Sequence, residues 1–308
     1  MSEYVAFDIG GTSIKYALVD DQGNISERGH FATPTARDEI IGKMCTAVSA
    51  YQAQHTVAGI GVSAPGIVRR DGYLVTGGAL MEFYEFDLRG TLAAKTGLPV
   101  VVENDANAAA LAERWQGSAQ GIDDYVCIVL GTGIGGGIVI NGKPYRGAHG
   151  MAGELGWMVT HDDDATGDLE DASLTFSASV VMGLLRRYNA AHKRVDPDAE
   201  EVTDARVVLE RSAAGDYTAY TEYHRFLHDI GIMCINLFAT LDPDRILIGG
   251  GISANPQFLA DLAATMDRLL TQHGSLNRIR DKALGKVMAA GLRNDAGLLG
   301  AVYPLLQA

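Results

Sequence analysis

Apolar and polar residues follow one another along the chain in short blocks that predict strands and helices in turn. Apolar runs that end in glycine or in a hairpin turn predict strands, and apolar residues spaced three or four apart predict helices. The strands expected in the first part of the chain are residues 4–9, 13–20, 57–63 and 100–102. The helices expected there are residues 35–55, 88–96 and 105–115.

The same pattern restarts near residue 125. A strand at 125–130 enters a glycine turn at 131–137 and a strand at 138–140, and Asn141-Gly142 predicts a two-residue hairpin. Both halves open with a strand, a glycine turn that contains threonine, a second strand and a hairpin, which we interpret as a weak internal repeat. A third glycine turn ends the strand expected at 245–251, and helices are expected at 174–194, at 204–240, after Asn255-Pro256 and at 295–306.

Strands that alternate with helices, together with hairpins, predict an α/β fold with mixed sheets. A length of 308 residues suggests two domains. We expect them at residues 1–117 and 118–292, with the last helix at 293–308 packing back on the first domain.

Composition excludes some partners. The 38 acidic and 25 basic residues give a net charge of −13, which disfavours binding to nucleic acid or to an anionic membrane. Three isolated cysteines (Cys45, Cys127 and Cys234) are typical of reduced thiols in a cytoplasmic protein. The first residues lack the basic and apolar segments of a signal peptide, and no run approaches the roughly 20 apolar residues of a membrane span.

Three glycine turns that each follow an apolar strand need a common explanation. Backbone without Cβ atoms can approach an anion closely and direct its N–H groups at phosphate oxygens. Asp8, at the first turn, would hold Mg²⁺ beside such phosphates, directly or through water, and Lys15 could offset phosphate charge. One turn alone would be read as a hairpin or a bulge. No turn matches the GxxxxGK[ST] phosphate loop, and the hairpins disfavour a dinucleotide fingerprint.

Two further segments carry candidate chemistry. Asp105 lies where a strand is expected to meet a helix, so it is interpreted as a helix cap, as a general base, or as both. Asn104 beside it offers a hydrogen-bond donor and an acceptor to a polyol. Glu154 is a carboxylate among glycines, and Trp157 is either core packing or a flat surface for a sugar ring. His149 and His161 lack zinc-ligand spacing, and residues 161–171 are interpreted as a solvated acidic loop.

Six motifs together resemble the ROK family of sugar kinases and sugar-responsive repressors. They are DIGGTSIKYALVD at 8–20, GVSAPGIV at 61–68, ENDANAAALAE at 103–113, GTGIGGGIVINGK at 131–143, GMAGELG at 150–156 and LIGGGIS at 247–253. The resemblance implies the two-domain actin-like ATPase (ribonuclease H-like) fold, with ATP, Mg²⁺ and a hexose in an interdomain cleft. It also suggests a homodimer.

The resemblance assigns roles residue by residue. Asp105 matches the catalytic base that accepts the proton of the sugar 6-hydroxyl. The phosphate and adenosine turns match Asp8, Gly10, Gly11 and Thr12, then Gly131, Thr132, Gly133 and Gly135, then Gly249, Gly250 and Gly251. The sugar site matches Gly66, Asn104, Asp105, Glu154 and Glu170, to which we add Trp157.

Three departures from the family pattern affect the substrate. Trp157 replaces the histidine of AGExGH, the CxCGxxGC zinc cluster is missing, and Ala79 stands where the sugar-loop asparagine is expected. These changes imply a zinc-free subgroup with an altered anomeric end of the sugar site. A β-glucoside or disaccharide kinase is therefore favoured, with glucokinase and N-acetylmannosamine kinase as alternatives.

Two other classes are less well matched. A sugar-sensing repressor of the family would carry a helix-turn-helix before the first strand, but only seven residues precede Asp8. A non-catalytic, actin-like structural protein would not need the ENDA and AGE sugar motifs.

Overall fold

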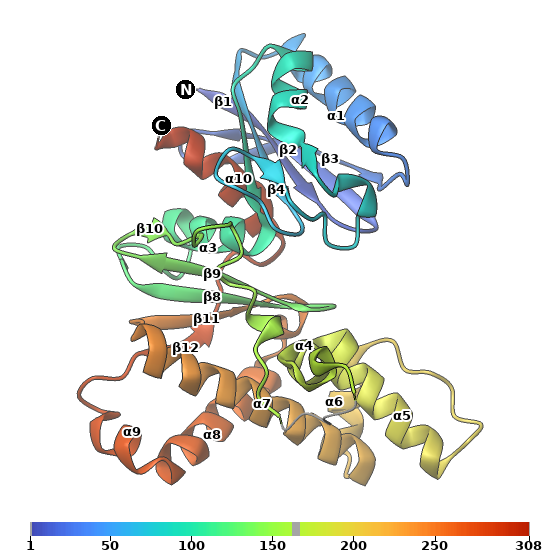
Figure 1. The fold of residues 1–308 in the computed structure, drawn as a ribbon, viewed down its shortest axis with the longest axis vertical. Helices are drawn as coiled ribbons and strands as arrows, with labels where there is room; N and C mark the ends of the chain where they lie inside the picture. Colours follow the sequence, from blue (N-terminus) through green and yellow to red (C-terminus); the bar gives the residue numbers. More distant parts are fainter. Residues whose placement is uncertain (1, 162–166, 308) are drawn as a thin grey trace. The chain divides into compact units, whose positions relative to one another are not determined.

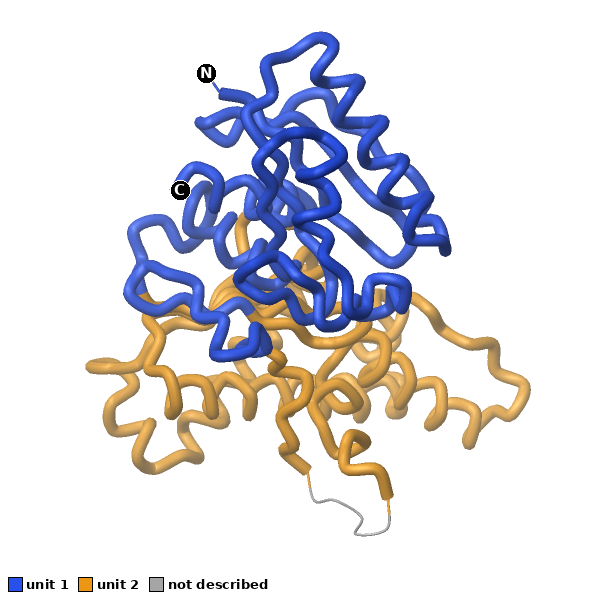
Figure 2. The backbone as a smooth tube through the Cα atoms, turned by 45° about the horizontal axis from the view of Figure 1, so that its top comes forward, with its two compact units in different colours: residues 1–123, 137–153, 294–308 blue, residues 124–136, 154–293 orange. Residues whose placement is uncertain are grey.

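The computed structural model describes residues 2–161 and 167–307 and divides them into two compact units. Unit 1 comprises residues 1–123, 137–153 and 294–308, and unit 2 comprises residues 124–136 and 154–293 (Figure 2). Part of the predicted acidic loop, residues 162–166, lies outside the described residues. The α/β fold with mixed sheets is confirmed.

The sheet of unit 1 has five strands in the order β3-β2-β1-β4-β7 (Figure 1). β1 pairs antiparallel with β2 and β2 with β3, whereas β1, β4 and β7 are parallel. The strands are β1 (Glu3–Ile9), β2 (Ser13–Asp20), β3 (Ile25–Ala32), β4 (Val57–Ala64) and β7 (Val100–Asn104). A small second sheet pairs β5 (Tyr73–Leu74) with β6 (Phe86–Asp87).

Helices cover both faces of this sheet because alternate strand residues point to opposite sides. Val5 and Phe7 of β1 join a buried apolar cluster with Ile40 and Met44 of α1 (Arg37–Gln52) and Leu92 of α2 (Leu88–Thr96).

The opposite face receives α10 (Ala296–Leu306), which also packs on α3 (Asp105–Gln116). Glycines allow this close approach, since a Cβ at Gly61 would lie 2.3 Å from the Ala301 carbonyl oxygen. A Cβ at Gly300 would lie 1.7 Å from the Ala108 carbonyl oxygen.

The second five-stranded sheet repeats the arrangement, in the order β10-β9-β8-β11-β12. β8, β11 and β12 are parallel, and β9 pairs antiparallel with β10. The strands are β8 (Tyr125–Leu130), β9 (Ile134–Ile140), β10 (Lys143–Pro144), β11 (Arg245–Gly249) and β12 (Lys286–Ala289). The matching strand orders support the internal repeat predicted from the sequence.

Unit 2 carries most of the remaining helices. They are α4 (Leu174–Ala178), a π-helical turn at Val180–Leu185, α5 (Arg186–Val195), α6 (Ala205–Ala213), α7 (Tyr217–Leu241), α8 (Pro256–Gln272) and α9 (Gly274–Ile279). Asn255 caps α8 and Pro256 opens it, as predicted. In the described part of the chain, no helix is long and apolar enough to cross a membrane.

Two predicted boundaries were wrong. The glycine turn after β8 was expected to extend to residue 137, but β9 begins at Ile134. Gly137 belongs to the strand, and glycine is needed there because α3 lies so close that a Cβ would be 2.5 Å from the Ala106 carbonyl oxygen. The helix expected at 204–240 is two helices, because the backbone turns at Gly215 with φ +89°.

Candidate active site

Asp8 lies near the end of β1, in register with Lys15 on β2 and Ser63 on β4. The Ser63 hydroxyl donates a 2.9 Å hydrogen bond to Asp8 Oδ1, and Lys15 Nζ lies 3.9 Å from Oδ2. Burial raises the pKa of Asp8, and the Ser63 bond and the Lys15 charge oppose that rise. A bound cation would favour the ionised carboxylate, so Asp8 fits a metal ion that is held largely by water and ligand oxygens.

Helix α10 closes one side of Asp8. A Cβ at Gly297 would lie 2.4 Å from Asp8 Oδ1, so only glycine fits there without displacing the carboxylate. Sequence reasoning missed both Gly297 and Ser63. Ser63 had a usable signal, since it lies near the end of a strand parallel to β1, whereas nothing local links Gly297 to Asp8.

The first glycine turn is closed by one backbone hydrogen bond and one from a side chain. Gly10 N–H donates to the Ser13 carbonyl at 3.1 Å, and the Thr33 hydroxyl donates to the Gly10 carbonyl at 2.6 Å. Gly11 and Thr12 are exposed. Their backbone is therefore open to an approaching anion next to the Asp8 carboxylate.

Asn104 and Asp105 lie where β7 ends and α3 begins. The structure makes Asn104 the helix cap, since Asn104 Oδ1 accepts from the N–H groups of Ala106 at 2.9 Å and Asn107 at 3.1 Å. The cap interpretation of Asp105 is thereby corrected, because Asp105 is already the first helical residue. Asp105 Oδ1 still accepts from the Ala106 N–H at 2.8 Å.

The Asp105 carboxyl group is held on one side only. Within the described residues its hydrogen bonds reach Oδ1, from Ala106 N–H and from Asn104 Nδ2 at 3.0 Å. Asp105 retains exposed surface, yet the surrounding protein disfavours its charged form and the negative charge of Asp8 adds to this. Both effects outweigh the Ala106 and Asn104 bonds and raise the pKa of Asp105 to about 6. Asp105 is therefore ionised at neutral pH but remains basic enough to accept a proton.

Gly66 supports Asn104. Its carbonyl accepts a 2.9 Å hydrogen bond from Asn104 Nδ2. Gly66 has φ +88°, and a Cβ would lie 2.3 Å from the Thr76 carbonyl oxygen, so the loop requires glycine. The structure thus places Gly66 beside the predicted sugar pair as a support for Asn104.

In unit 2, two glycine turns follow neighbouring parallel strands. Gly131-Thr132-Gly133 follows β8, and Gly249-Gly250-Gly251 ends β11, so both lie at the same edge of the sheet. Gly131 N–H donates to the Gly133 carbonyl at 3.0 Å, and the Gly131 carbonyl accepts from Val180 N–H at 3.0 Å. Gly135 lies within β9 and not in the turn.

Gly250 is the sterically demanding position of the third turn. It has φ +90°, and a Cβ would lie 2.0 Å from the Leu130 carbonyl oxygen. Ser253 holds the turn closed through its hydroxyl, which donates 2.8 Å to the Gly250 carbonyl. The two turns of unit 2 are therefore packed against each other through Leu130.

Glu154 and Trp157 flank one short helical turn, Leu155–Trp157, within unit 2. This turn is fixed beside the start of β9, since a Cβ at Gly156 would lie 3.0 Å from the Ile134 carbonyl oxygen. The Trp157 side chain is 49% exposed, so the core-packing interpretation was wrong and a flat accessible surface remains.

Glu170 lies on a neighbouring segment. It belongs to the turn Leu169–Ala172 and is exposed. A bridge between Val159 and Ser173 brings this turn alongside the segment that follows Trp157.

Metal ligands do not converge elsewhere in the described part of the chain. No group of three or more His, Cys, Asp or Glu residues there could hold a metal ion. His149 is exposed, and His161 Nε2 instead lies 3.3 Å from Asp229 Oδ1.

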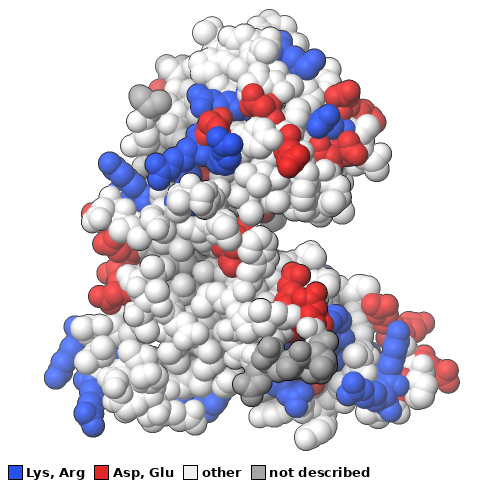
Figure 3. All heavy atoms as spheres, in the orientation of Figure 1, with Lys and Arg blue, Asp and Glu red and all other residues white. Residues whose placement is uncertain are grey.

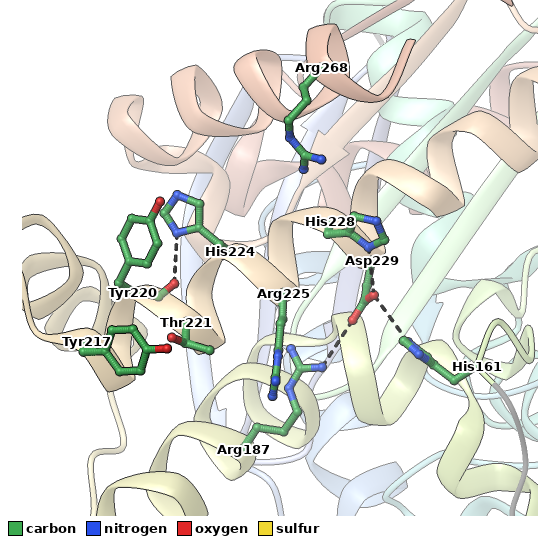
Figure 4. Close-up of a pocket in the computed structure, with 10 residues that line it drawn as sticks. All are labelled: His161, Arg187, Tyr217, Tyr220, Thr221, His224, Arg225, His228, Asp229 and Arg268. Carbon is green, nitrogen blue, oxygen red and sulfur yellow. Dashed lines mark hydrogen bonds and ion pairs between the residues drawn. The ribbon is translucent and has the colours of Figure 1, made fainter. Parts of the chain in front are cut away.

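A recess of about 540 Å³ in unit 2 surrounds Asp229 (Figure 4). Asp229 is buried on α7, forms an ion pair with Arg187 at 3.2 Å, and lies 3.3 Å from His161 Nε2 and 3.5 Å from His228 Nδ1. The Arg268 side chain points into the recess from α8 and has no ion pair or hydrogen bond with the described residues. None of the residues predicted for the active site lines this recess.

Comparison with known proteins identifies relatives of this chain. A β-glucoside kinase from Listeria monocytogenes is 37% identical over 305 residues, covering 98% of this chain and 97% of the relative. The structure of Lmo2764 from the same organism, whose name proposes an N-acetylmannosamine kinase, aligns with a TM-score of 0.85 at 33% identity and covers 99% of both chains.

A third relative has a structure that contains two bound molecules. The ROK family glucokinase from Streptomyces griseus, in complex with glucose and AMPPNP, aligns with a TM-score of 0.78 at 30% identity over 97% of this chain and 98% of that one. These neighbours have the actin-like ATPase fold that the motifs implied. Residues 4–308 match the ROK family profile, and this chain therefore belongs to the ROK family.

Proposed function

We propose that this protein is an ATP-dependent sugar kinase that transfers the γ-phosphoryl group to a sugar 6-hydroxyl, with Asp105 as the base. The observation that carries the proposal is the Asp105 carboxyl group, which has Oδ1 anchored and a pKa raised to about 6. The S. griseus neighbour bound to glucose and AMPPNP supports both substrates.

The chemistry follows from these groups. The sugar 6-hydroxyl transfers its proton to Asp105 while its oxygen forms a bond to the γ-phosphorus. The bond from the γ-phosphorus to the bridging oxygen breaks, and ADP leaves with that electron pair. Asn104 keeps Asp105 aimed at the hydroxyl, since positioning supplies much of the rate in such transfers.

The remaining assignments concern the nucleotide. Backbone N–H groups at residues 10–12 and 131–133 would hold the phosphates, with Lys15 offsetting charge, and residues 249–251 would lie on the adenosine side. Mg²⁺, when bound, neutralises charge on the phosphate oxygens. Asp8 would hold it, directly or through water.

We further propose a β-glucoside or disaccharide as the substrate. Trp157 is exposed next to Glu154 and offers a flat apolar face, and an aromatic plane there could stack on an aglycone or second sugar ring. The identity to a β-glucoside kinase over almost the whole chain favours this choice. Glucokinase and N-acetylmannosamine kinase activity are the competing assignments.

An ATP-coupled screen over cellobiose, methyl β-glucoside, glucose and N-acetylmannosamine tests the assignment. We expect turnover of the β-glucosides by wild type and a KM for them raised about tenfold in Trp157→Ala, because roughly 1–3 kcal/mol of contact is lost. Tyr217→Ala, which removes an 81% exposed aromatic side chain elsewhere in unit 2, is the matched control. Exclusive use of N-acetylmannosamine would refute the β-glucoside assignment, and no sugar-dependent turnover would leave a non-catalytic sensor.

The domain division at residues 117–118, the homodimer and the cytoplasmic location remain proposals. Light scattering at micromolar concentration tests the dimer, for which we expect twice the chain mass.

All three cysteines are free thiols, which agrees with a reducing compartment.

A further inference from the structure

A cavity of about 760 Å³ opens on unit 1, away from the residues assigned above. Its walls come from the turn at residues 69–70, the hairpin at 141–146, β7, α3 and the end of α10. The volume is within the range of small-molecule sites, about 300–1,000 Å³.

Five basic side chains line the cavity. They are Arg69, Arg70, Arg114, Lys143 and Arg146, against one acidic residue, Glu103. Several Lys and Arg side chains gather on unit 1 in the view of Figure 3, although the chain as a whole has a net charge of −13. Concentrating positive charge in a concave site attracts anions.

Two of these cations lack a protein partner. Arg69 pairs with Asp71 at 2.6 Å and Arg114 with Asp123 at 2.9 Å. In contrast, the side chains of Arg70 and Lys143 form no ion pair or hydrogen bond with any described residue. Their charges are available to a ligand.

The fifth cation connects the cavity to the candidate base. Arg146 donates through Nε, at 3.0 Å, and Nη2 to Glu103 Oε2. The Glu103 side chain is only 3% exposed, and its Oε1 accepts from the Asn104 N–H and from Asn107 Nδ2, both at 3.1 Å. Since Asn104 anchors Asp105, the wall of the cavity and the base are joined by one chain of hydrogen bonds that passes through the Asn104 backbone N–H and side chain.

We propose that this cavity binds a small metabolite that carries a phosphate group, and that occupancy slows phosphoryl transfer through Arg146 and Glu103. The phosphate engages Arg70 and Lys143 and competes with Glu103 for Arg146, because Arg prefers planar, bidentate contacts with either anion. Glu103 then holds Asn104 less firmly. Binding is independent of the proposed function, whereas the effect on rate rests on it.

Binding is measured by thermal unfolding with inorganic phosphate or glucose 6-phosphate, at ionic strength matched with chloride. At a hundredfold excess over the dissociation constant we expect a rise of roughly 3–6 °C in wild type and little rise in Arg70→Gln/Lys143→Gln. A response to both probes assigns the phosphate group, and a response to glucose 6-phosphate alone assigns a sugar phosphate. An equal rise in the double variant and wild type would overturn the proposal.

Two variants control for charge and folding. Arg268→Gln removes an unpaired arginine from the recess of unit 2 and should respond like wild type. Arg70→Lys/Lys143→Arg keeps both charges and should restore the response. If Arg70→Gln/Lys143→Gln does not fold in the absence of ligand, Arg70→Gln or Lys143→Gln alone takes its place. We expect each single variant to show a rise in unfolding temperature between those of wild type and the double variant.

The effect on rate is measured at saturating ATP and sugar. Phosphate should lower kcat several-fold in wild type and in Arg268→Gln, but less in Arg70→Gln/Lys143→Gln. Equal inhibition of all three would place the phosphate at the active site and overturn the coupling. A loss of sugar kinase activity in every assay would contradict the proposed function and leave the binding result intact.

Discussion

In unit 1 the strand before the first glycine turn carries Asp8, whereas β8, its counterpart in the second sheet, carries Val129 at the same place. Both residues stand two positions before a glycine, and both face the next parallel strand, at Ser63 and Gly249 respectively. One strand order thus supports two kinds of turn. The turn of unit 1 lies beside the charged side chains of Asp8 and Lys15, whereas the turns at 131–133 and 249–251 hold glycine and the uncharged Thr132, so we expect unit 1 to control the chemical step and unit 2 to control binding.

The largest expected effect comes from Asp105. Asp105→Asn removes the base but keeps the Asn104 cap, so the fold should persist while kcat falls about 10²- to 10⁴-fold. Steady-state kinetics with circular dichroism measures both. Asp87→Asn, at the cap of α2, is the control and should keep wild-type kcat. A wild-type kcat in Asp105→Asn would contradict the assignment of Asp105 as the base.

Two glycines of unit 2 should separate folding from binding. Gly250→Ala places a Cβ 2.0 Å from the Leu130 carbonyl oxygen at φ +90°, so we expect a loss of about 2–4 kcal/mol in the free energy of unfolding. A Cβ at Gly131 meets nothing within 4 Å, so Gly131→Ala should stay folded but raise the KM for ATP, because the methyl group enters the space of the phosphates. Urea denaturation and ATP titration measure the two effects, and an unchanged KM would argue against the second phosphate turn.

The smallest effect is a shift of the pH profile. Because Asp105 must be ionised to accept a proton and its pKa is about 6, kcat should rise between pH 5 and 7 and then level off. The negative charge of Asp8 raises the pKa of Asp105, so in Asp8→Asn the midpoint should move to lower pH, whatever the height of the plateau. Asp38→Asn, an exposed carboxylate on α1, should leave the midpoint in place. A midpoint that moves to higher pH in Asp8→Asn contradicts the coupling of the two carboxylates.

Local sequence predicted those elements whose signals are local. The structure has β2, β8 and α2 at the residues expected, because alternation, helical spacing and glycine stops act over a few neighbouring positions. The repeat of strand, turn and hairpin likewise anticipated the shared order of the two sheets.

Other features depend on contacts between distant segments. Gly137 was predicted in a turn but lies in β9, where the contact with α3 requires glycine, and of the two interpretations of Trp157 the structure keeps the exposed surface. The support of Asp105 by Glu103 and Arg146 joins a strand end to a hairpin far along the chain.

The amino-acid sequence alone determined the family, the element types, the glycine turns and the identity of Asp8 and Asp105 as candidate carboxylates of the site. Only the tertiary structure decided that Ser63 and Gly297 enclose Asp8, that Asn104 caps α3, and that the pKa of Asp105 rises to about 6. Hydrogen bonding and burial depend on which segments meet in space, and residues from opposite ends of the chain meet at Asp8.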